Sequence, residues 1–314
     1  FDITEHKSVY LYSSFLRNEA FGNFKKIINY VTISPAMLEF LNGDKNIKQS
    51  PNENYARELL ELYTVGKGQL VNDGDYSTFT EKDVSEIAKI LTGWEIKGRL
   101  TTNPTDNNKS VLESFFTVDK HDSSTKTLSH RFNNQKIENK NEKEYAYLID
   151  VLLKQEIVAE NICKKIYRWF VNSTIDSDIE LHIIKPLAKM LYNNGYEIQP
   201  ILKKLLSSNH FYNNIHNSSK IKNPYEFVFA ILNKFQVKSP TNLSDNISYW
   251  HQVFNLASSM GMEYYVPPNV AGWKAYYQAP LYDNIWINAS TLQKRKIFVQ
   301  KIVEDGINIS DGFV

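Results

Sequence analysis

Polar side chains gather in one short segment, from residue 51 to residue 66, which reads PNENYARELLELYTVG. Each residue of an α-helix turns by about 100°, so this spacing brings four polar residues to one stripe. They are Asn54, Arg57, Glu58 and Glu61. Two carboxylates, a guanidinium and an amide that face a cleft could bind a cation or a polar substrate. Glu58 and Glu61, one turn apart, could share a divalent metal or hold unequal pKa values for acid–base chemistry.

The same stripe also fits an ordinary amphipathic helix with a solvated charged face. Arg57 would then form i,i+4 pairs with Glu53 and Glu61, each worth a few tenths of a kcal/mol. Glu53 would serve as the capping-box partner of Ser50, three residues before it. A binding stripe must line a concave surface, so burial decides between the two interpretations.

A second candidate is the adjacent pair His121 and Asp122, which follows a short β-like run. The histidine could ligate a metal that the aspartate helps to orient, or it could act as a general base. Neighbouring residues of a strand point in opposite directions, so the pair chelates as a unit only in a turn. The alternative is an Asx-type turn with the histidine as a surface or core residue.

A long segment, residues 262–287, is rich in proline and aromatic residues. Trp273 and Trp286 are its candidate substrate-binding residues, because aromatic rings on a stiff loop can stack on sugar rings. Gly272 permits a tight turn before Trp273. The alternative is that these rings fill the helical core, since Trp and Tyr bury large areas.

Composition excludes several classes of function. The 314 residues carry 36 Lys+Arg and 35 Asp+Glu, a net charge of +1, which gives no argument for a nucleic-acid partner. The single cysteine, Cys163, excludes a disulfide framework and a multi-cysteine zinc site, and its place in an apolar stripe predicts a buried thiol. The sequence contains no run of about 18 apolar residues, so we expect no membrane-spanning helix. The sequence contains no His-Glu-x-x-His motif of zinc proteases, no Gly-x-Ser-x-Gly elbow of hydrolases and no Gly-x-x-x-x-Gly-Lys phosphate loop.

The first residues, Phe1–His6, have neither a charged n-region nor an apolar h-region, so we expect no signal peptide there. The chain does not begin with Met, which suggests that it is trimmed and leaves room for an upstream leader.

Apolar residues recur every three or four positions along most of the chain, which predicts a mainly α fold. We expect helices to start after Ser34, Ser50, Thr80 and Asn223, each of which precedes a capping pattern. A hairpin should pair Trp94–Lys97 with Ser114–Val118. These elements predict a single large helical domain, residues 1–314, with a small hairpin or irregular insert at about 95–140 and an ordered aromatic loop at about 262–287.

Several motifs occur in a fixed order along the chain. They are Pro51-Asn52-Glu53-Asn54 with Ala56-Arg57-Glu58-Leu59, Tyr76 with Thr80-Glu81-Lys82-Asp83-Val84, Leu91-Thr92-Gly93-Trp94, His121-Asp122 and Pro267-Pro268-Asn269-Val270-Ala271-Gly272-Trp273. This set resembles the bacterial family called domain of unknown function 1800, over about residues 34 to 298. Within the motifs we assign a structural role to Asn52, Glu53 and Trp94.

The resemblance implies a bacterial protein that is often exported, hence a periplasmic or secreted location. It also implies a partner family that resembles sulfatases and is often encoded beside it. Family members usually carry a Trp-His-x-x-His-like stretch upstream, and nothing before Phe1 is given.

Two functional hypotheses follow. In the first, Glu58, Glu61, His121 and Asp122 are catalytic residues, Asn54 and Arg57 bind substrate, and the reaction is the hydrolysis of a polar polymer or a small anionic substrate, with a divalent metal as candidate cofactor. In the second, the protein is a non-catalytic module whose aromatic loop binds a glycan or a protein, and the Asn-Glu-Asn helix is a structural polar network.

Overall fold

Helices make up most of the computed structural model, which describes residues 6–98, 112–213 and 220–304. The mainly α fold class is confirmed. The chain divides into two compact units, and each is described by itself. Among the described residues, the large unit holds 6–98, 112–167 and 175–211, and the small unit holds 168–174, 212–213 and 220–304. The single domain stays a prediction. The expectations for Phe1–Glu5 and for residues 99–111 of the insert lie outside the described residues.

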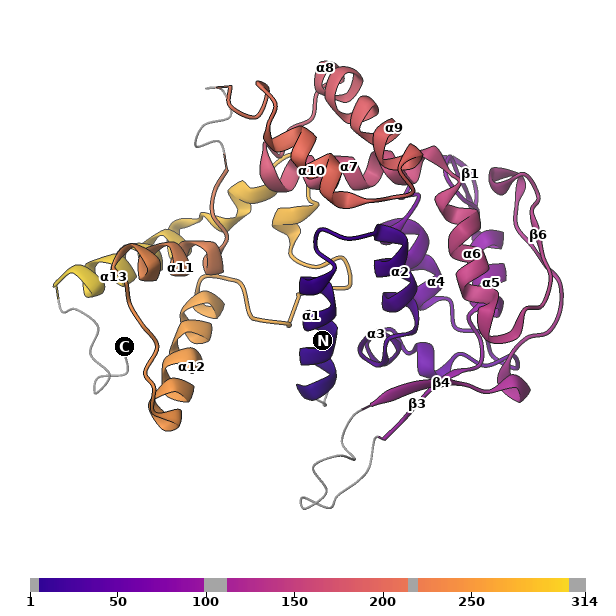
Figure 1. Cartoon of the computed structure of the whole chain (residues 1–314), viewed down its shortest axis with the longest axis horizontal. Helices are drawn as coiled ribbons and strands as arrows, with labels where there is room; N and C mark the ends of the chain where they lie inside the picture. Colours follow the sequence, from indigo (N-terminus) through magenta and orange to yellow (C-terminus); the bar gives the residue numbers. More distant parts are fainter. Residues whose placement is uncertain (1–5, 99–111, 214–219, 305–314) are drawn as a thin grey trace. The chain divides into compact units, whose positions relative to one another are not determined.

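The large unit is built mainly from helices, with a few short strands between them (Figure 1). Its helices are α1 (His6–Asn18), α2 (Phe24–Ile33), α3 (Pro35–Phe40), α4 (Asn54–Glu58), α5 (Glu81–Ile90), α6 (Glu144–Leu153), α7 (Glu156–Phe170), α8 (Ser177–Ile179), α9 (Lys185–Asn193) and α10 (Ile198–Leu206), with π-helical segments η2 (Leu59–Tyr63) and η6 (Glu180–Ile184). The helix α2 packs against α3 and α6, and α5 packs between α4 and α6. No described helix combines the length and the apolar character that a bilayer span requires.

Three antiparallel two-stranded sheets lie in the large unit, among the residues that the structure describes. They pair β1 (Leu70–Asn72) with β2 (Asp75–Tyr76), β3 (Trp94–Lys97) with β4 (Glu113–Phe116), and β5 (Lys126–Thr127) with β6 (Lys136–Ile137). In the second sheet Trp94 lies opposite Phe116 and Lys97 opposite Glu113. The predicted hairpin is therefore confirmed.

Side-chain caps start three of the predicted helices. The Ser34 hydroxyl accepts a hydrogen bond from the Met37 amide at the start of α3. Thr80 forms a reciprocal capping box with Asp83, and Asn223 forms one with Glu226. Each cap satisfies amides that have no partner within their own helix. These three predicted starts are confirmed.

The predicted capping box at Ser50 is wrong. The helix α4 begins at Asn54, and its N-cap residue Glu53 makes no side-chain cap. Instead Asn52 Oδ1 accepts a hydrogen bond from the Asn54 amide at 2.9 Å. An asparagine two residues before the first helical amide offers it an Asx turn, which competes with a cap from further upstream.

The helix that follows Asn52 is α-helical only to Glu58 and then becomes the π-helical segment η2. The wider turn is closed by Gly66, whose amide donates to the Leu60 carbonyl at 2.9 Å. Thr64 Oγ1 also donates to the carbonyl five residues before it, at 2.6 Å. From α7, Asn161 Nδ2 donates to the carbonyl of Val65 at 2.6 Å. The predicted stripe of regular α-helical spacing therefore ends at Glu58, because these bonds hold a π turn beyond it.

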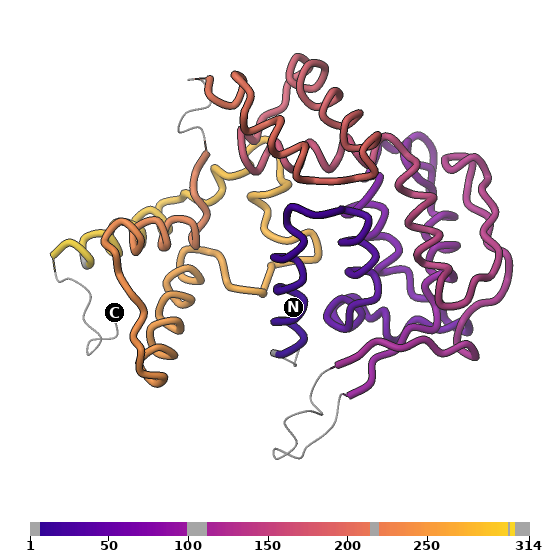
Figure 2. The backbone as a smooth tube through the Cα atoms, in the orientation of Figure 1, coloured from indigo at the N-terminus to yellow at the C-terminus, as the bar shows by residue number. Residues whose placement is uncertain are grey.

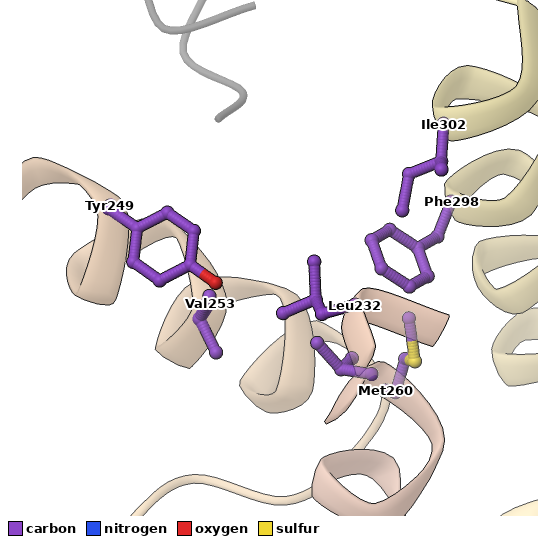
Figure 3. Packing of buried hydrophobic residues seen from close by; sticks show 7 residues of the cluster. Leu232, Tyr249, Val253, Met260, Phe298 and Ile302 are labelled. Atoms are coloured by element: carbon purple, nitrogen blue, oxygen red, sulfur yellow. The ribbon is translucent and has the colours of Figure 1, made fainter. Parts of the chain in front are cut away.

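The small unit contains α11 (Pro224–Lys234), α12 (Leu243–Ser259) and α13 (Ala289–Glu304), which Figure 2 follows in orange and yellow. Side chains from all three helices and the residue that follows α12 form its core. They are Val228, Leu232, Tyr249, Val253, Met260, Phe298 and Ile302 (Figure 3). The aromatic loop between α12 and α13 contains two 3-10 turns, η8 (Lys274–Tyr276) and η9 (Tyr282–Trp286).

Candidate functional site

The helix α5 carries one polar group at each end, and the candidate residues divide between them. Glu81, its first residue, binds Arg57. Thr92, two residues past its end, contacts His121. Thr92 lies eleven positions after Glu81, which is about 16 Å along a helix at 1.5 Å per residue. The Glu58–Glu61 pair belongs to the group at the start of α5, and the His121–Asp122 pair belongs to the group at its end.

We call the first group the Arg57 cluster, and its members come from α4, η2, the residues that flank these two segments, and the start of α5 (Figure 1). They are Glu53, Arg57, Glu58, Glu61, Lys67 and Glu81. Asn54 beside them is exposed.

Arg57 is held by a bidentate ion pair with Glu81. Its Nη1 lies 2.8 Å from Glu81 Oε1, and its Nη2 lies 2.6 Å from Glu81 Oε2. The two predicted i,i+4 partners are looser, at 3.4 Å for Glu53 and 3.8 Å for Glu61. The hydrogen bond from Arg57 lowers the pKa of Glu81, although burial opposes the shift. A fork-to-fork pair fixes the guanidinium plane, so Arg57 presents a defined edge to Glu61.

Glu61 lies between two cations without a close bond to either. Its Oε1 is 3.4 Å from Lys67 Nζ and 3.8 Å from Arg57 Nη1. This oxygen is shielded from water and accepts no hydrogen bond from the part of the chain that the structure describes. The two nearby cations replace part of the hydration that this oxygen loses on burial, but no described group donates a hydrogen bond to it. It is therefore an open acceptor inside the cluster.

Glu58 has a different environment from Glu61. It is half-buried, and this burial raises its pKa, with a further upward contribution from the negative charge of Glu61. Arg57 and Lys67 oppose the shift. Burial, and then the charge of Glu58, also raise the pKa of Tyr63. Two neighbouring carboxyl groups in unlike surroundings are the arrangement from which acid–base pairs are made.

The second group, which we call the His121 network, is buried. His121 is 2% exposed, and its Nδ1 lies 2.9 Å from the Thr92 carbonyl oxygen. A carbonyl can only accept, so Nδ1 carries a hydrogen. The other ring nitrogen, Nε2, lies 3.0 Å from Oε2 of Glu144, the first residue of α6.

Glu144 completes the His121 network with Lys126, and both are fully buried at 0% exposure. Glu144 Oε1 is 2.7 Å from Lys126 Nζ, a close ion pair although its angle falls outside hydrogen-bond geometry. Glu144 Oε2 also accepts the Lys140 amide at 3.2 Å. Glu144 therefore holds Lys126 at one carboxyl oxygen and His121 at the other. Removal of one partner from such a pair typically costs about 3–5 kcal/mol of stability.

Asp122 adopts the Asx-type turn that was the alternative for this pair. Its Oδ1 accepts hydrogen bonds from the Ser124 amide at 2.8 Å and the Ser124 hydroxyl at 2.5 Å. Burial opposes ionisation here, but these bonds and the charge of Lys126 together lower the pKa of Asp122. Lys126 also donates to the Asp122 carbonyl. Asp122 therefore shapes the turn that brings Lys126 to Glu144.

The Leu91-Thr92-Gly93-Trp94 turn is shaped to receive His121. Gly93 has a φ of +91°, and a Cβ there would lie 2.9 Å from the Thr117 carbonyl oxygen and 3.1 Å from the His121 Cβ. Any other residue would push the histidine away from the turn. Trp94 packs edge-on against Phe116 and Tyr145, with ring centroids 5.5 Å apart in both cases. The structural role assigned to Trp94 agrees with this packing.

Sequence reasoning missed Asn46, which joins three segments. Its side-chain amide donates to the Ala88 carbonyl at 2.9 Å, and its Oδ1 accepts the Asn52 amide at 2.8 Å. Its own carbonyl accepts the Gly93 amide at 3.0 Å. Asn46 therefore fixes the loop before α4 on the last turn of α5. An isolated asparagine outside any motif gives no signal of such a role.

The buried groups leave no described metal site. Among the residues with described positions, no three side chains of His, Cys, Asp or Glu are grouped so as to hold a metal ion. Cys163 is buried as predicted, and burial raises its pKa to about 12.

The two candidate tryptophans of the aromatic loop in the small unit differ in exposure. Trp286 is 5% exposed and packs edge-on against Tyr276, so its ring is not available to a ligand. Trp273 is half-exposed and follows Gly272, whose φ is +90°. Nearby, the exposed Tyr277 accepts a hydrogen bond from Asn269 at 2.8 Å, which fixes the turn.

The model of a family described as "Protein of unknown function (DUF1800)" matches residues 3–311. The chain belongs to this family. The comparisons with curated proteins and with solved structures gave no match.

The raised pKa of Glu58 predicts how Glu58→Gln changes stability with pH. A carboxyl group whose pKa is higher in the folded state stabilises the fold at low pH, and this contribution is lost as pH rises through the folded pKa. The Glu58→Gln variant has no ionisable group at this position, so it does not lose this stability as pH rises. We therefore expect the variant to gain stability relative to the wild type between about pH 4 and pH 7.

Urea unfolding at both pH values measures this difference. Glu53→Gln is the matched control, since it removes a more exposed carboxylate at the start of the same helix. An equal difference between Glu58→Gln and wild type at both pH values would contradict the assignment.

Proposed function

We propose that the protein, as a member of this family of unknown function, is a hydrolase that binds a hydroxyl-rich polymer at the Arg57 cluster. Glu58 gives or takes the proton, and Glu61 accepts a hydrogen bond from the substrate. The observation that carries the proposal is the unlike surroundings of these two carboxyl groups: burial and the charge of its neighbour raise the pKa of Glu58, whereas Glu61 lies beside Arg57 and Lys67. General acid–base catalysis works best when the pKa of the group approaches the working pH.

The open oxygen of Glu61 supports binding of a hydroxyl group. Glu61 Oε1 accepts no hydrogen bond within the described ranges, and a substrate hydroxyl would supply one. Such a bond relieves a desolvation penalty that is typically about 1–3 kcal/mol. Glu81 holds the guanidinium of Arg57 in place, so Arg57 can orient the bound group without reorganising.

The π-helical segment after Glu58 gives independent support. Such segments are rare and occur frequently at functional sites. Here Thr64, Gly66 and Asn161 hold it with side-chain and backbone bonds, so the wide turn belongs to the folded state.

The charge of the cluster narrows the substrate class. Four carboxyl groups face two cations, Arg57 and Lys67, so a neutral hydroxyl-rich group or a cation suits the cluster better than the small anion first considered. Metal assistance remains part of the proposal in the form of a divalent cation bound between Glu58 and Glu61.

Hydrolysis of a panel of soluble polysaccharides, followed by release of reducing ends, tests the proposal. We expect Glu58→Gln to lower the rate by about 100-fold or more, as loss of a general acid or base does, with an unchanged circular dichroism spectrum. Glu53→Gln is the control and should retain most of the activity. Parallel assays with added Ca²⁺ or Mg²⁺ and with a chelator report on the cation. No hydrolysis of any polymer, or equal rates for Glu58→Gln and wild type, would contradict the proposal.

A second candidate function is binding of a glycan through the aromatic loop, and the half-exposed Trp273 on its tight turn favours it. Binding should quench tryptophan fluorescence, and Trp273→Ala should weaken it by up to about tenfold, because a stacked ring contributes roughly 0.5–1.5 kcal/mol. Leu281→Ala, which changes an exposed apolar residue of the same loop, is the control. No quenching by any polysaccharide of the panel would contradict this function. A sulfatase-like protein is the other proposed partner. Co-purification with such a protein would indicate that the loop binds a protein and not a glycan.

A further inference from the structure

A cavity of about 320 Å³ lies in the large unit, between α1, the start of α3 and β4. Its walls include apolar and aromatic side chains. They are Leu11, Tyr12, Tyr30, Pro35, Ala36 and Leu112. The volume falls at the lower end of the range for small-molecule sites. None of the Arg57 cluster or the His121 network lines it.

One wall of the cavity is a rigid stack of rings. Tyr30 lies flat on Phe15, with centroids 3.6 Å apart and planes inclined by 17°. The Tyr12 ring lies near Tyr30, with centroids 6.3 Å apart and planes inclined by 28°. Rings held by stacking lose little freedom when a further ring contacts them. This wall therefore suits a flat, apolar body.

One hydroxyl group at the cavity has no hydrogen-bond partner. Ser8 is 5% exposed, and its Oγ is shielded from water without a hydrogen-bond partner in the described part of the chain. Ser34 differs, because its hydroxyl caps α3 and donates to the Val31 carbonyl. A buried hydroxyl without a partner is unfavourable, and Ser8 lines the cavity, so a ligand hydroxyl there could supply the missing hydrogen bond.

The charge at the cavity is balanced. Glu113, the lining carboxylate, lies 2.8 Å from Lys97 Nζ across the β3–β4 hairpin. Both side chains are largely exposed, so the pair is solvated. A neutral ligand therefore suits the cavity better than an ion.

We propose that this cavity binds a small, neutral, ring-shaped molecule of the phenol class, whose ring lies against Tyr12 and Tyr30 and whose hydroxyl bonds to Ser8 Oγ. The stacked rings supply the flat wall, the shielded hydroxyl supplies the specific contact, and the balanced charge favours a neutral ligand over an ion. The site is separate from the hydrolase proposed above, so either can fail without the other.

Ligand-observed NMR with para-cresol and toluene as probes tests the site, because the two differ only by the hydroxyl group. We expect wild-type protein to bind para-cresol about tenfold more tightly than toluene, since one hydrogen bond contributes about that factor. Ser8→Ala should reduce para-cresol affinity to that of toluene. Ser13→Ala is the matched control, because Ser13 on the same helix bonds only its own backbone, and the preference should persist.

A second variant tests the location. Leu11 lines the cavity and is 42% exposed, so Leu11→Trp can fill the space without disturbing the core, and it should abolish binding of both probes. Absence of para-cresol binding to wild type at about 10 mM would overturn the proposal. An unchanged preference in Ser8→Ala, or unchanged binding to Leu11→Trp, would overturn it as well.

Discussion

The carboxylate of Glu144 is completely buried, and a charge removed from water must be matched by opposite charges nearby. Lys126 supplies the opposite charge, and His121, from a different segment, lies against the other carboxyl oxygen. Their contacts tie the start of α6 to the turn after α5 and to the β3–β4 hairpin, because His121 also bonds Thr92 and packs against Phe116. The packing of these segments of the large unit therefore depends on the contacts of one buried carboxyl group, that of Glu144.

Burial and hydrogen bonding distinguish the two groups of candidate residues. His121 looked like a metal ligand or base, but both of its ring nitrogens are engaged and its exposure is 2%. The Arg57 cluster is different, since Glu58 is half-buried and Glu61 keeps an unused oxygen. Both groups lie along α5, so the buried network at one end of the helix holds in place the partner that Arg57 uses at the other.

Local features of the fold were predictable because local sequence determines them. Caps at Ser34, Thr80 and Asn223 act within three residues, and the β3–β4 hairpin follows from two short β-forming runs. The π-helical turn was missed because bonds from Thr64 and from Asn161, about a hundred residues away, override the local α-helical spacing. Glu81 and Glu144 were missed as partners for the same reason: side-chain pairs across 24 and 23 residues leave no periodic signal. The sequence identifies the residue types at the candidate positions, but it does not predict how deeply each side chain is buried.

Diethyl pyrocarbonate modification of the folded protein, with each histidine quantified by mass spectrometry, tests the central claim most directly. The account predicts that His121 stays unmodified while His130 and His182, whose side chains are 60% and 64% exposed, react readily. Modification of His121 at the rate of these two residues would show that it faces solvent, and it would contradict a closed network around Glu144.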